Sequence, residues 1–208
     1  MDPQLTGQKY DRIARWWQDR HDGSSYGVSM LRRALDYCPP GGGHALDVGC
    51  GAGGRMVRAM EVRGFQVTGI DVSAEMIRLA EAAHPDGRFI RADISSWQTG
   101  ETFHLILAWD SIFHLPLAMQ EPVVRHLCRM LRPGGVLLYT FGNAEGEHTD
   151  SWQGDQFYYS SLGIKANLQL LSEGGLTPMH LELDQYPEKH VCMIACRMAP
   201  SHSDKEQP

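Results

Sequence analysis

The stretch that decides the fold runs from His44 to Gly54 and reads HALDVGCGAGG. Its residues 45–50 form an almost unbroken apolar run of strand length, which predicts a buried β-strand. The glycines that follow allow a tight turn and let a ligand approach the backbone. A helix is expected from Gly54 to Arg63, and its start would offer free N–H groups. We therefore expect a ligand site where this strand passes into this helix.

Outward from this turn, apolar strand-like segments alternate with helix-like ones. Further strands are predicted at 67–72, 88–94, 103–110 and 135–142, and further helices at 73–84 and 119–132. Ser73 stands where it can cap the first of these two helices. Strands that are almost continuously apolar are covered on both faces. The sequence thus predicts an α/β fold with a Rossmann-like, doubly wound and mostly parallel sheet.

Two strands near the C-terminus break this alternation. They are predicted at 177–186 and 190–198, after a helix at 160–173. Because a parallel crossover needs a dozen or more residues, so short a link joins them as an antiparallel hairpin. The sheet should therefore contain one reversed strand. Residues 143–159 are polar, glycine-rich and aromatic, which is typical of a functional surface loop.

Domain organisation follows from the same reading. Residues 1–40 are expected to form a helical cap of two helices, ended by Pro39, Pro40 and three glycines. Residues 44–198 should form the Rossmann-like core, so that 1–198 make a single domain. Residues 199–208 are expected to be a flexible, solvated tail.

Composition narrows the class of partner. The 208 residues include 19 Lys and Arg against 25 Asp and Glu, a net charge of −6, and no basic run suggests a nucleic-acid partner. The sequence shows neither a signal peptide nor an apolar stretch of membrane-spanning length, so no membrane association is expected. Its five cysteines form no C-x-x-C pair, which fits a cytoplasmic protein. The histidines lack metal-ligand spacing, so no metal is expected, and the oligomeric state stays open.

The glycine turn fits two kinds of cofactor. Gly49, Gly51 and Gly54 satisfy G-x-G-x-x-G, and Asp71 follows at the spacing of a dinucleotide-binding fingerprint. An NAD(P)-dependent oxidoreductase is therefore one interpretation. Asp47 argues against it, because a carboxylate two residues before the first glycine would repel a pyrophosphate and would favour a cationic ligand.

The segment ALDVGCGAGG resembles motif I of the class I S-adenosylmethionine-dependent methyltransferases, and the rest of the chain is similar to that family in order. In this family the glycine loop receives the methionine part of the cofactor, whose ammonium and sulfonium groups are both positive. The resemblance implies S-adenosyl-L-methionine as cofactor, S-adenosyl-L-homocysteine as product, and methyl transfer to an O, N or S atom of a small molecule. A non-catalytic cofactor-binding protein on the same fold remains an alternative. A tRNA or protein acceptor is disfavoured by the acidic balance.

The resemblance also implies roles for single residues. Asp71 would accept hydrogen bonds from the ribose hydroxyls, and Asp93 would meet the adenine amino group. Tyr10 belongs to a segment similar to the Y-D-x-I-A start of small-molecule members, in which N-terminal helices cover the cofactor. The implied cofactor contacts together are Tyr10, Asp47, Gly49, Gly51, Gly53, Asp71, Val72, Met76, Asp93, Ile94 and Trp109.

Methyl transfer is an in-line displacement, so the protein mainly aligns the acceptor and excludes water. A general base matters only for a hydroxyl or a protonated amine. His114, after the fourth strand, is a candidate base or acceptor anchor, and alternatively a structural histidine bonded to the loop backbone. Asp110 is a candidate to orient His114 or to meet the cofactor, and alternatively caps the turn.

Aromatic residues supply the candidate acceptor wall. The residues proposed to contact the acceptor are His148, Trp152, Tyr158 and Tyr159. A packed lid without ligand contact explains them nearly as well. Trp16 and Trp17 are expected to cover core rather than to line a cofactor site, and Glu188 with His190 is expected only to mark the hairpin turn.

Overall fold

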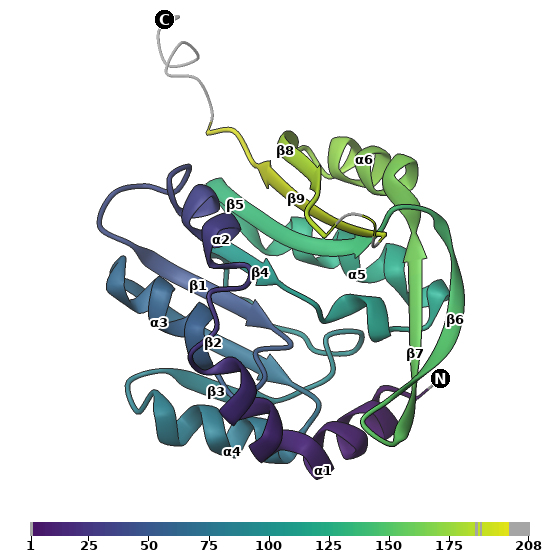
Figure 1. Ribbon diagram of the computed structural model, residues 1–208. Helices are drawn as coiled ribbons and strands as arrows, with labels where there is room; N and C mark the ends of the chain where they lie inside the picture. Colours follow the sequence, from purple (N-terminus) through teal and green to yellow (C-terminus); the bar gives the residue numbers. More distant parts are fainter. Residues whose placement is uncertain (1, 186, 188, 200–208) are drawn as a thin grey trace, which may run out of the picture.

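The computed structural model describes residues 2–185, 187 and 189–199 and contains a seven-stranded sheet (Figure 1). Its strand order is β3-β2-β1-β4-β5-β9-β8. The strands are β1 (Gly43–Val48), β2 (Phe65–Asp71), β3 (Arg88–Arg91), β4 (Phe103–Ala108), β5 (Leu131–Gly142), β8 (Thr177–Leu183) and β9 (His190–Cys196). β9 pairs antiparallel with β5 and β8, while the remaining pairs of this sheet are parallel. The predicted mostly parallel sheet with one reversed strand is confirmed.

Helices cover both faces of the sheet. They are α1 (Pro3–His21), α2 (Val28–Leu35), α3 (Gly54–Val62), α4 (Ala74–Ala83), the 3-10 helix η1 (Ile112–His114), α5 (Leu117–Met130) and α6 (Gly163–Glu173). Along β4, Leu105 and Leu107 pack with the cluster that contains α2, α3 and α4 side chains, and Ile106 packs with that of α5 and α6. The apolar strands are thus covered on both faces, as their composition predicted. Within the described residues, no helix is both long and apolar enough to cross a membrane.

The segment expected to be a surface loop is a second, two-stranded sheet instead. β6 (Glu145–Trp152) and β7 (Asp155–Leu162) pair antiparallel and run along the right-hand side of Figure 1. Because β6 is polar and almost wholly exposed, it lacks the apolar alternation that identifies a strand. β7 also displaces the start of the next helix from the predicted residue 160 to Gly163.

Other boundaries shift by only a few residues. β3 ends at Arg91 rather than 94, and α5 ends at Met130 because β5 already begins at Leu131. The predicted tail lies outside the described residues apart from Ala199.

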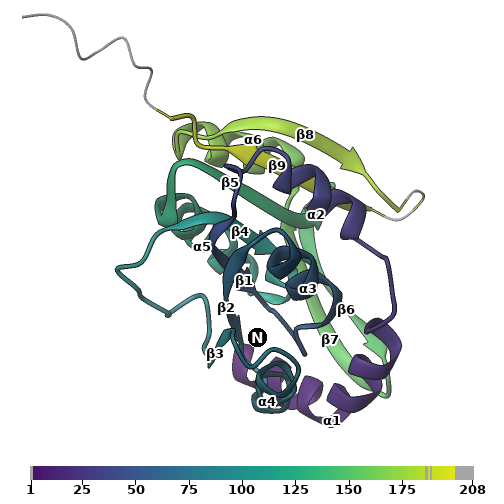
Figure 2. The same cartoon turned by 90° about the vertical axis from the view of Figure 1, so that its left-hand side faces the viewer.

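Helix α1 is attached to the first turn of α4, as both views of the ribbon show (Figures 1 and 2). The Asp11 carboxylate accepts hydrogen bonds from Ser73 Oγ (2.6 Å) and from the Glu75 amide (3.0 Å). Ser73 Oγ in turn accepts from the Met76 amide (3.1 Å), so the predicted cap is confirmed. Gly7 lets α1 approach the backbone at Val72 closely. These contacts place α1 across the turn that follows β2.

Substitution of Gly7 tests this close approach. A Cβ at residue 7 would lie 2.7 Å from the Val72 carbonyl oxygen, which forces the backbone apart. We expect Gly7→Ala to lower the free energy of unfolding by about 1–3 kcal/mol, although alanine favours helix. Gly23→Ala is the control, because a Cβ there meets nothing within 4 Å. Equal denaturation midpoints for the two variants in urea would contradict the tight packing of α1.

Candidate functional site

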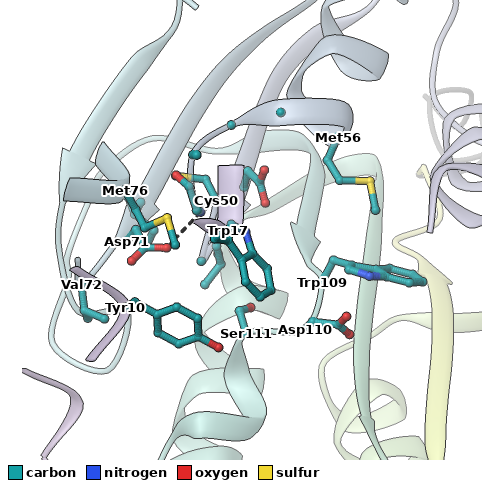
Figure 3. A pocket seen from close by; sticks show the side chains of 18 of the residues that line it. Tyr10, Trp17, Cys50, Met56, Asp71, Val72, Met76, Trp109, Asp110 and Ser111 are labelled. Carbon is teal, nitrogen blue, oxygen red and sulfur yellow. Dashed lines mark hydrogen bonds between the residues drawn. The ribbon is translucent and has the colours of Figure 1, made fainter. Parts of the chain in front are cut away.

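One cavity lies at the carboxyl ends of β1, β2 and β4, with α1 beside it. All eleven residues implied above as cofactor contacts line it. In Figure 3, Asp71 and Val72 lie at one side of the cavity, Trp109 and Asp110 at the other, and Trp17 between them. The arrangement joins residues that are more than 90 positions apart, from Tyr10 to Asp110.

The glycine turn brings bare backbone to the cavity. Gly49 has a φ of 72°, and a Cβ on it would lie 2.3 Å from Cβ of Ser111, so both conformation and space demand glycine there. The Gly49 and Cys50 amides both donate to the Ile70 carbonyl (2.8 and 3.1 Å), which fixes the turn against β2. α3 then begins without a side-chain cap, so its first amides are available to a ligand.

Asp71 and Asp93 keep acceptor capacity toward the cavity. Asp71 accepts hydrogen bonds from the amides of Gly51 (3.0 Å) and Ser73 (2.8 Å), one on each oxygen. Asp93 accepts one on Oδ1, from the Ser95 amide (2.9 Å). Since a carboxylate offers about four acceptor positions, both groups can take further donors such as hydroxyl or amino groups.

Two neighbouring carboxyl groups give the cavity its electrostatic character. Asp47 is only 3% exposed, and burial, reinforced by the charge of Asp71, raises its pKa to about 7. Burial likewise raises the pKa of Asp71 to about 6, against the effect of its backbone hydrogen bonds. Arg55 opposes the shift at Asp47 but does not cancel it. A cation bound beside these groups would favour their ionised forms, so the residues fit a positively charged ligand.

Tryptophan 17 lines the cavity, and the prediction that it only covers core is wrong. Its indole stacks on His21 (centroids 3.8 Å apart) and meets the ring of Tyr10 edge-on (5.7 Å). Trp16 is 39% exposed and packs against Trp152. Sequence spacing could not separate the two, because both lie on one turn of α1 and only its orientation decides which faces inward.

His114 lines the cavity as a neutral imidazole. Its Nδ1 lies 2.8 Å from the Tyr158 carbonyl and therefore carries the proton, and its Nε2 accepts from the Tyr10 hydroxyl (3.0 Å). Burial lowers the pKa of His114 to about 4. A base of this strength accepts protons poorly near pH 7, which favours an anchoring role over general-base catalysis.

Asp110 also lines the cavity, but it does not hydrogen-bond to His114 in the described structure. Its Oδ1 lies 2.7 Å from Nε2 of His190, whose Nδ1 bonds to Asp184. The idea that Asp110 orients His114 is therefore wrong, and so is the expectation that His190 only marks a turn. Glu188 lies outside the described residues. His190 reaches Asp110 because β9 pairs with β5 in a register that places His190 opposite Gly142. No spacing in the sequence reveals this pairing.

The four residues proposed for the acceptor lie on the β6–β7 hairpin, behind the wall of the cavity. None of His148, Trp152, Tyr158 and Tyr159 is among its described lining residues. His148 stacks on Tyr159 (5.2 Å), and Trp152 packs near Tyr10 (6.3 Å). Tyr158 supports the wall through its carbonyl bond to His114. This geometry favours the packed-lid interpretation of the hairpin.

Residues 45–135 match the model of a family described as a methyltransferase domain, and they contain the glycine turn, Asp71, Asp93 and Asp110. Over this segment, which is less than half of the chain, the protein is similar to the class I S-adenosylmethionine-dependent methyltransferases.

Two curated relatives of this chain illustrate the similarity. The trans-aconitate 2-methyltransferase of Paracidovorax citrulli is 38% identical over 97 residues, which cover 45% of this chain and 36% of the relative. The ubiquinone biosynthesis O-methyltransferase of Pseudomonas putida is 30% identical over 145 residues, covering 64% and 60% of the two chains. The chain thus spans less than two thirds of either relative.

Solved structures share the fold over nearly the whole chain. The DhpI–SAH complex has a TM-score of 0.70 at 19% identity and covers 96% of this chain and 98% of that one. The [4+2]-cyclase SpnF has a TM-score of 0.72 at 18% identity and covers 95% and 96%. The fold shared with these proteins therefore extends beyond the segment that the family model matches.

The buried acids predict a pH dependence of stability. A folded-state pKa of about 7 for Asp47 lies above the ordinary 3.8, so the folded state binds the proton more tightly than the unfolded state. Without ligand, the free energy of unfolding should fall as the pH rises from 5 to 8, by at most about 1.4 kcal/mol per pH unit for each such group. Asp47→Asn should flatten this slope, as measured by urea unfolding at pH 5, 6, 7 and 8.

The decisive quantity is the difference in pH slope between the wild-type protein and Asp47→Asn, because other groups titrate in the same pH range. The raised pKa of His190 makes stability fall with rising pH too, whereas the lowered pKa of His114 acts in the opposite direction below pH 6.5. Both contributions are common to the two proteins. If the free energy of unfolding changes with pH at the same slope in both proteins, Asp47 is not the acid whose pKa is raised on folding.

Proposed function

We propose that the protein is an enzyme that transfers the methyl group of S-adenosyl-L-methionine to an O, N or S atom of a small molecule. The observation that carries the proposal is a pair of carboxyls beside a turn of bare backbone, of which Asp47 is buried and Asp71 is half-buried. A dinucleotide would bring a pyrophosphate to this turn, where Asp47 would repel it. A ligand with positive ammonium and sulfonium groups would be stabilised there.

In this proposal the chain binds and orients both reactants. When bound, the cofactor supplies a methyl group on a positively charged sulfur. Asp71 accepts the ribose hydroxyls and Asp93 the adenine amino group, through the acceptor positions that their backbone bonds leave free. The remaining implied contacts complete the cavity: Tyr10, Asp47, Gly49, Gly51, Gly53, Val72, Met76, Ile94 and Trp109. Exclusion of water by this enclosure strengthens each electrostatic contact.

Residues 1–198 would act as one unit, in which the two N-terminal helices cover the cavity built by the core. α1 supplies Tyr10 and Trp17 to the wall, and the α1–α2 connection supplies Tyr26. His114 anchors Tyr10 rather than serving as the base. The five free cysteines fit a reducing compartment, so the proposal places the enzyme in the cytoplasm.

Substitution of Asp71 tests the cofactor assignment. Asp71→Ala removes the expected ribose acceptor and should weaken binding of S-adenosylhomocysteine by about 1–3 kcal/mol in calorimetric titration. Asp86→Ala, at an exposed carboxylate just after α4, is the matched control and should bind with unchanged affinity. Unchanged affinity in a fully folded Asp71→Ala protein would refute the assignment.

The choice of cofactor has its own test. Calorimetry of the wild-type protein with S-adenosylmethionine, S-adenosylhomocysteine, NAD⁺ and NADPH should give binding for the first two compounds. Because protonation neutralises Asp47 as the pH falls from 8 to 5, affinity for S-adenosylmethionine should fall over this range. Binding of a nicotinamide coenzyme without binding of either S-adenosyl compound would overturn the proposed function.

A further inference from the structure

At the end of the cavity opposite Asp71, three ionisable side chains form a row. His190, at the start of β9, lies between Asp184, in the turn after β8, and Asp110, at the end of β4. The His190 side chain is 13% exposed, and those of Asp184 and Asp110 are 10% and 25% exposed. Of the three, Asp110 lines the cavity. The row therefore leads from the edge of the sheet to the cavity wall.

We propose that this end of the cavity takes a methyl acceptor bearing a hydroxyl or ammonium group, and that His190 is the positioning residue that fixes Asp110 to receive this hydrogen-bond donor. The inference rests on the proposed function and deepens it by naming the acceptor class and a residue outside the cavity that serves it.

The hydrogen bonds to Asp110 show how it is fixed. Oδ1 accepts from Nε2 of His190 (2.7 Å) and from Oγ1 of Thr140 (3.2 Å), which itself accepts from the Asp110 amide (2.9 Å). These bonds hold a backbone with φ of 50°, which non-glycine residues seldom adopt. With Oδ1 engaged, the Oδ2 atom remains for the neighbouring Tyr26 and for a ligand in the cavity. A carboxylate accepts but does not donate, so its ligand must bring the hydrogen.

Charge on the cavity wall excludes one class of acceptor. Five aspartates line the described cavity, and Arg55 is the one lysine or arginine among its lining residues. Arg55 donates to the Tyr26 carbonyl (2.6 Å) and interacts with both Asp110 and Asp47. A single guanidinium, held through its Nε–H, therefore faces five aspartates, so the described wall offers little positive charge to an acceptor's carboxylates. A polycarboxylate would meet like charge at this wall, while a neutral or cationic acceptor would not.

The aromatic side chains beside Asp110 suit the same acceptor class. Trp109 and Tyr26 meet edge-on (5.4 Å) and both line the cavity. Such rings pack against an apolar acceptor body, and their faces also attract an ammonium group. The Nε1–H of Trp109 is buried and has no partner within the described residues.

The test uses the protein saturated with S-adenosylhomocysteine and three probes: catechol for the hydroxyl, benzylamine for the ammonium group, and trans-aconitate for a tricarboxylate. Binding is measured by calorimetry. At least one of catechol and benzylamine should bind about tenfold more tightly than trans-aconitate, and the stronger of the two identifies the donor. Failure of both donor probes to bind, or equal binding of the tricarboxylate, overturns the inference.

Variants of His190 separate positioning from mere support of the fold. His190→Leu should weaken the donor probe about tenfold and should change affinity for S-adenosylhomocysteine far less, because the described hydrogen bonds of His190 go to Asp184 and Asp110 and not to Asp47, Asp71 or Asp93. His190→Gln should restore much of the loss, since its side-chain N–H can donate to Asp110. His180→Gln is the control on the same hairpin, where His180 contacts Arg33 and Glu182 instead.

If His190→Leu lowers stability, Asp184→Asn provides a second variant that keeps the side-chain size and should also weaken the donor probe. Unchanged donor affinity in folded His190→Leu or Asp184→Asn protein would assign the row a structural role only. If the wild-type protein fails to bind S-adenosylhomocysteine, the proposed function itself fails. If it binds S-adenosylhomocysteine but neither donor probe, only the further inference fails.

Discussion

The burial of two carboxyl groups side by side constrains the whole site. Asp47 and Asp71 end adjacent strands that pair in parallel, with Val48 opposite Ile70, so both reach the same edge of the sheet. In the described structure the Asp71 carboxylate accepts hydrogen bonds from the amides of Gly51 and Ser73. The fold is strong enough to hold this unfavourable arrangement because strands buried on both faces supply a large apolar core. A positive ligand bound beside the two acids would offset this unfavourable arrangement, so the arrangement favours binding of such a ligand.

Helix α1 makes that affinity effective by limiting solvent access. It is fastened to the start of α4 through Asp11 and Ser73, next to the acid it helps to cover. Tyr10 and Trp17 then present aromatic surface rather than water to the ligand. The low local dielectric strengthens the attraction between acids and cation, and also raises the pKa values that reveal it. The covering helix α1 and the charge of the two acids therefore both strengthen binding of a positive ligand.

Sequence predicts the parts of the fold whose signals are local. The glycine turn, the apolar strands and the Ser73 cap are each determined within a dozen residues, and each lies where expected. The β6–β7 hairpin was not predicted from the sequence, because its polar strand β6 is stabilised by pairing with β7 and not by a buried apolar face. His190 escaped for a related reason, since it meets Asp110 across 80 residues through the register of β9 on β5. Distant pairings of this kind have no periodicity to read.

The two histidines near the acceptor end show how environment decides role. His114 is buried among aromatic rings, and burial keeps it neutral beside the cavity. Burial would also lower the pKa of His190, but its hydrogen bonds to Asp110 and Asp184 and their charges outweigh that effect and raise it. The hydrogen bonds from His190 and Thr140 compensate part of the negative charge that Asp110 brings to the cavity wall. In the described structure, Asp71 thus accepts hydrogen bonds from backbone amides, whereas Asp110 pairs with the imidazole of His190. In the proposed function, this difference would let a cofactor with an ammonium and a sulfonium group and an uncharged or singly positive acceptor occupy one cavity in a fixed order along it.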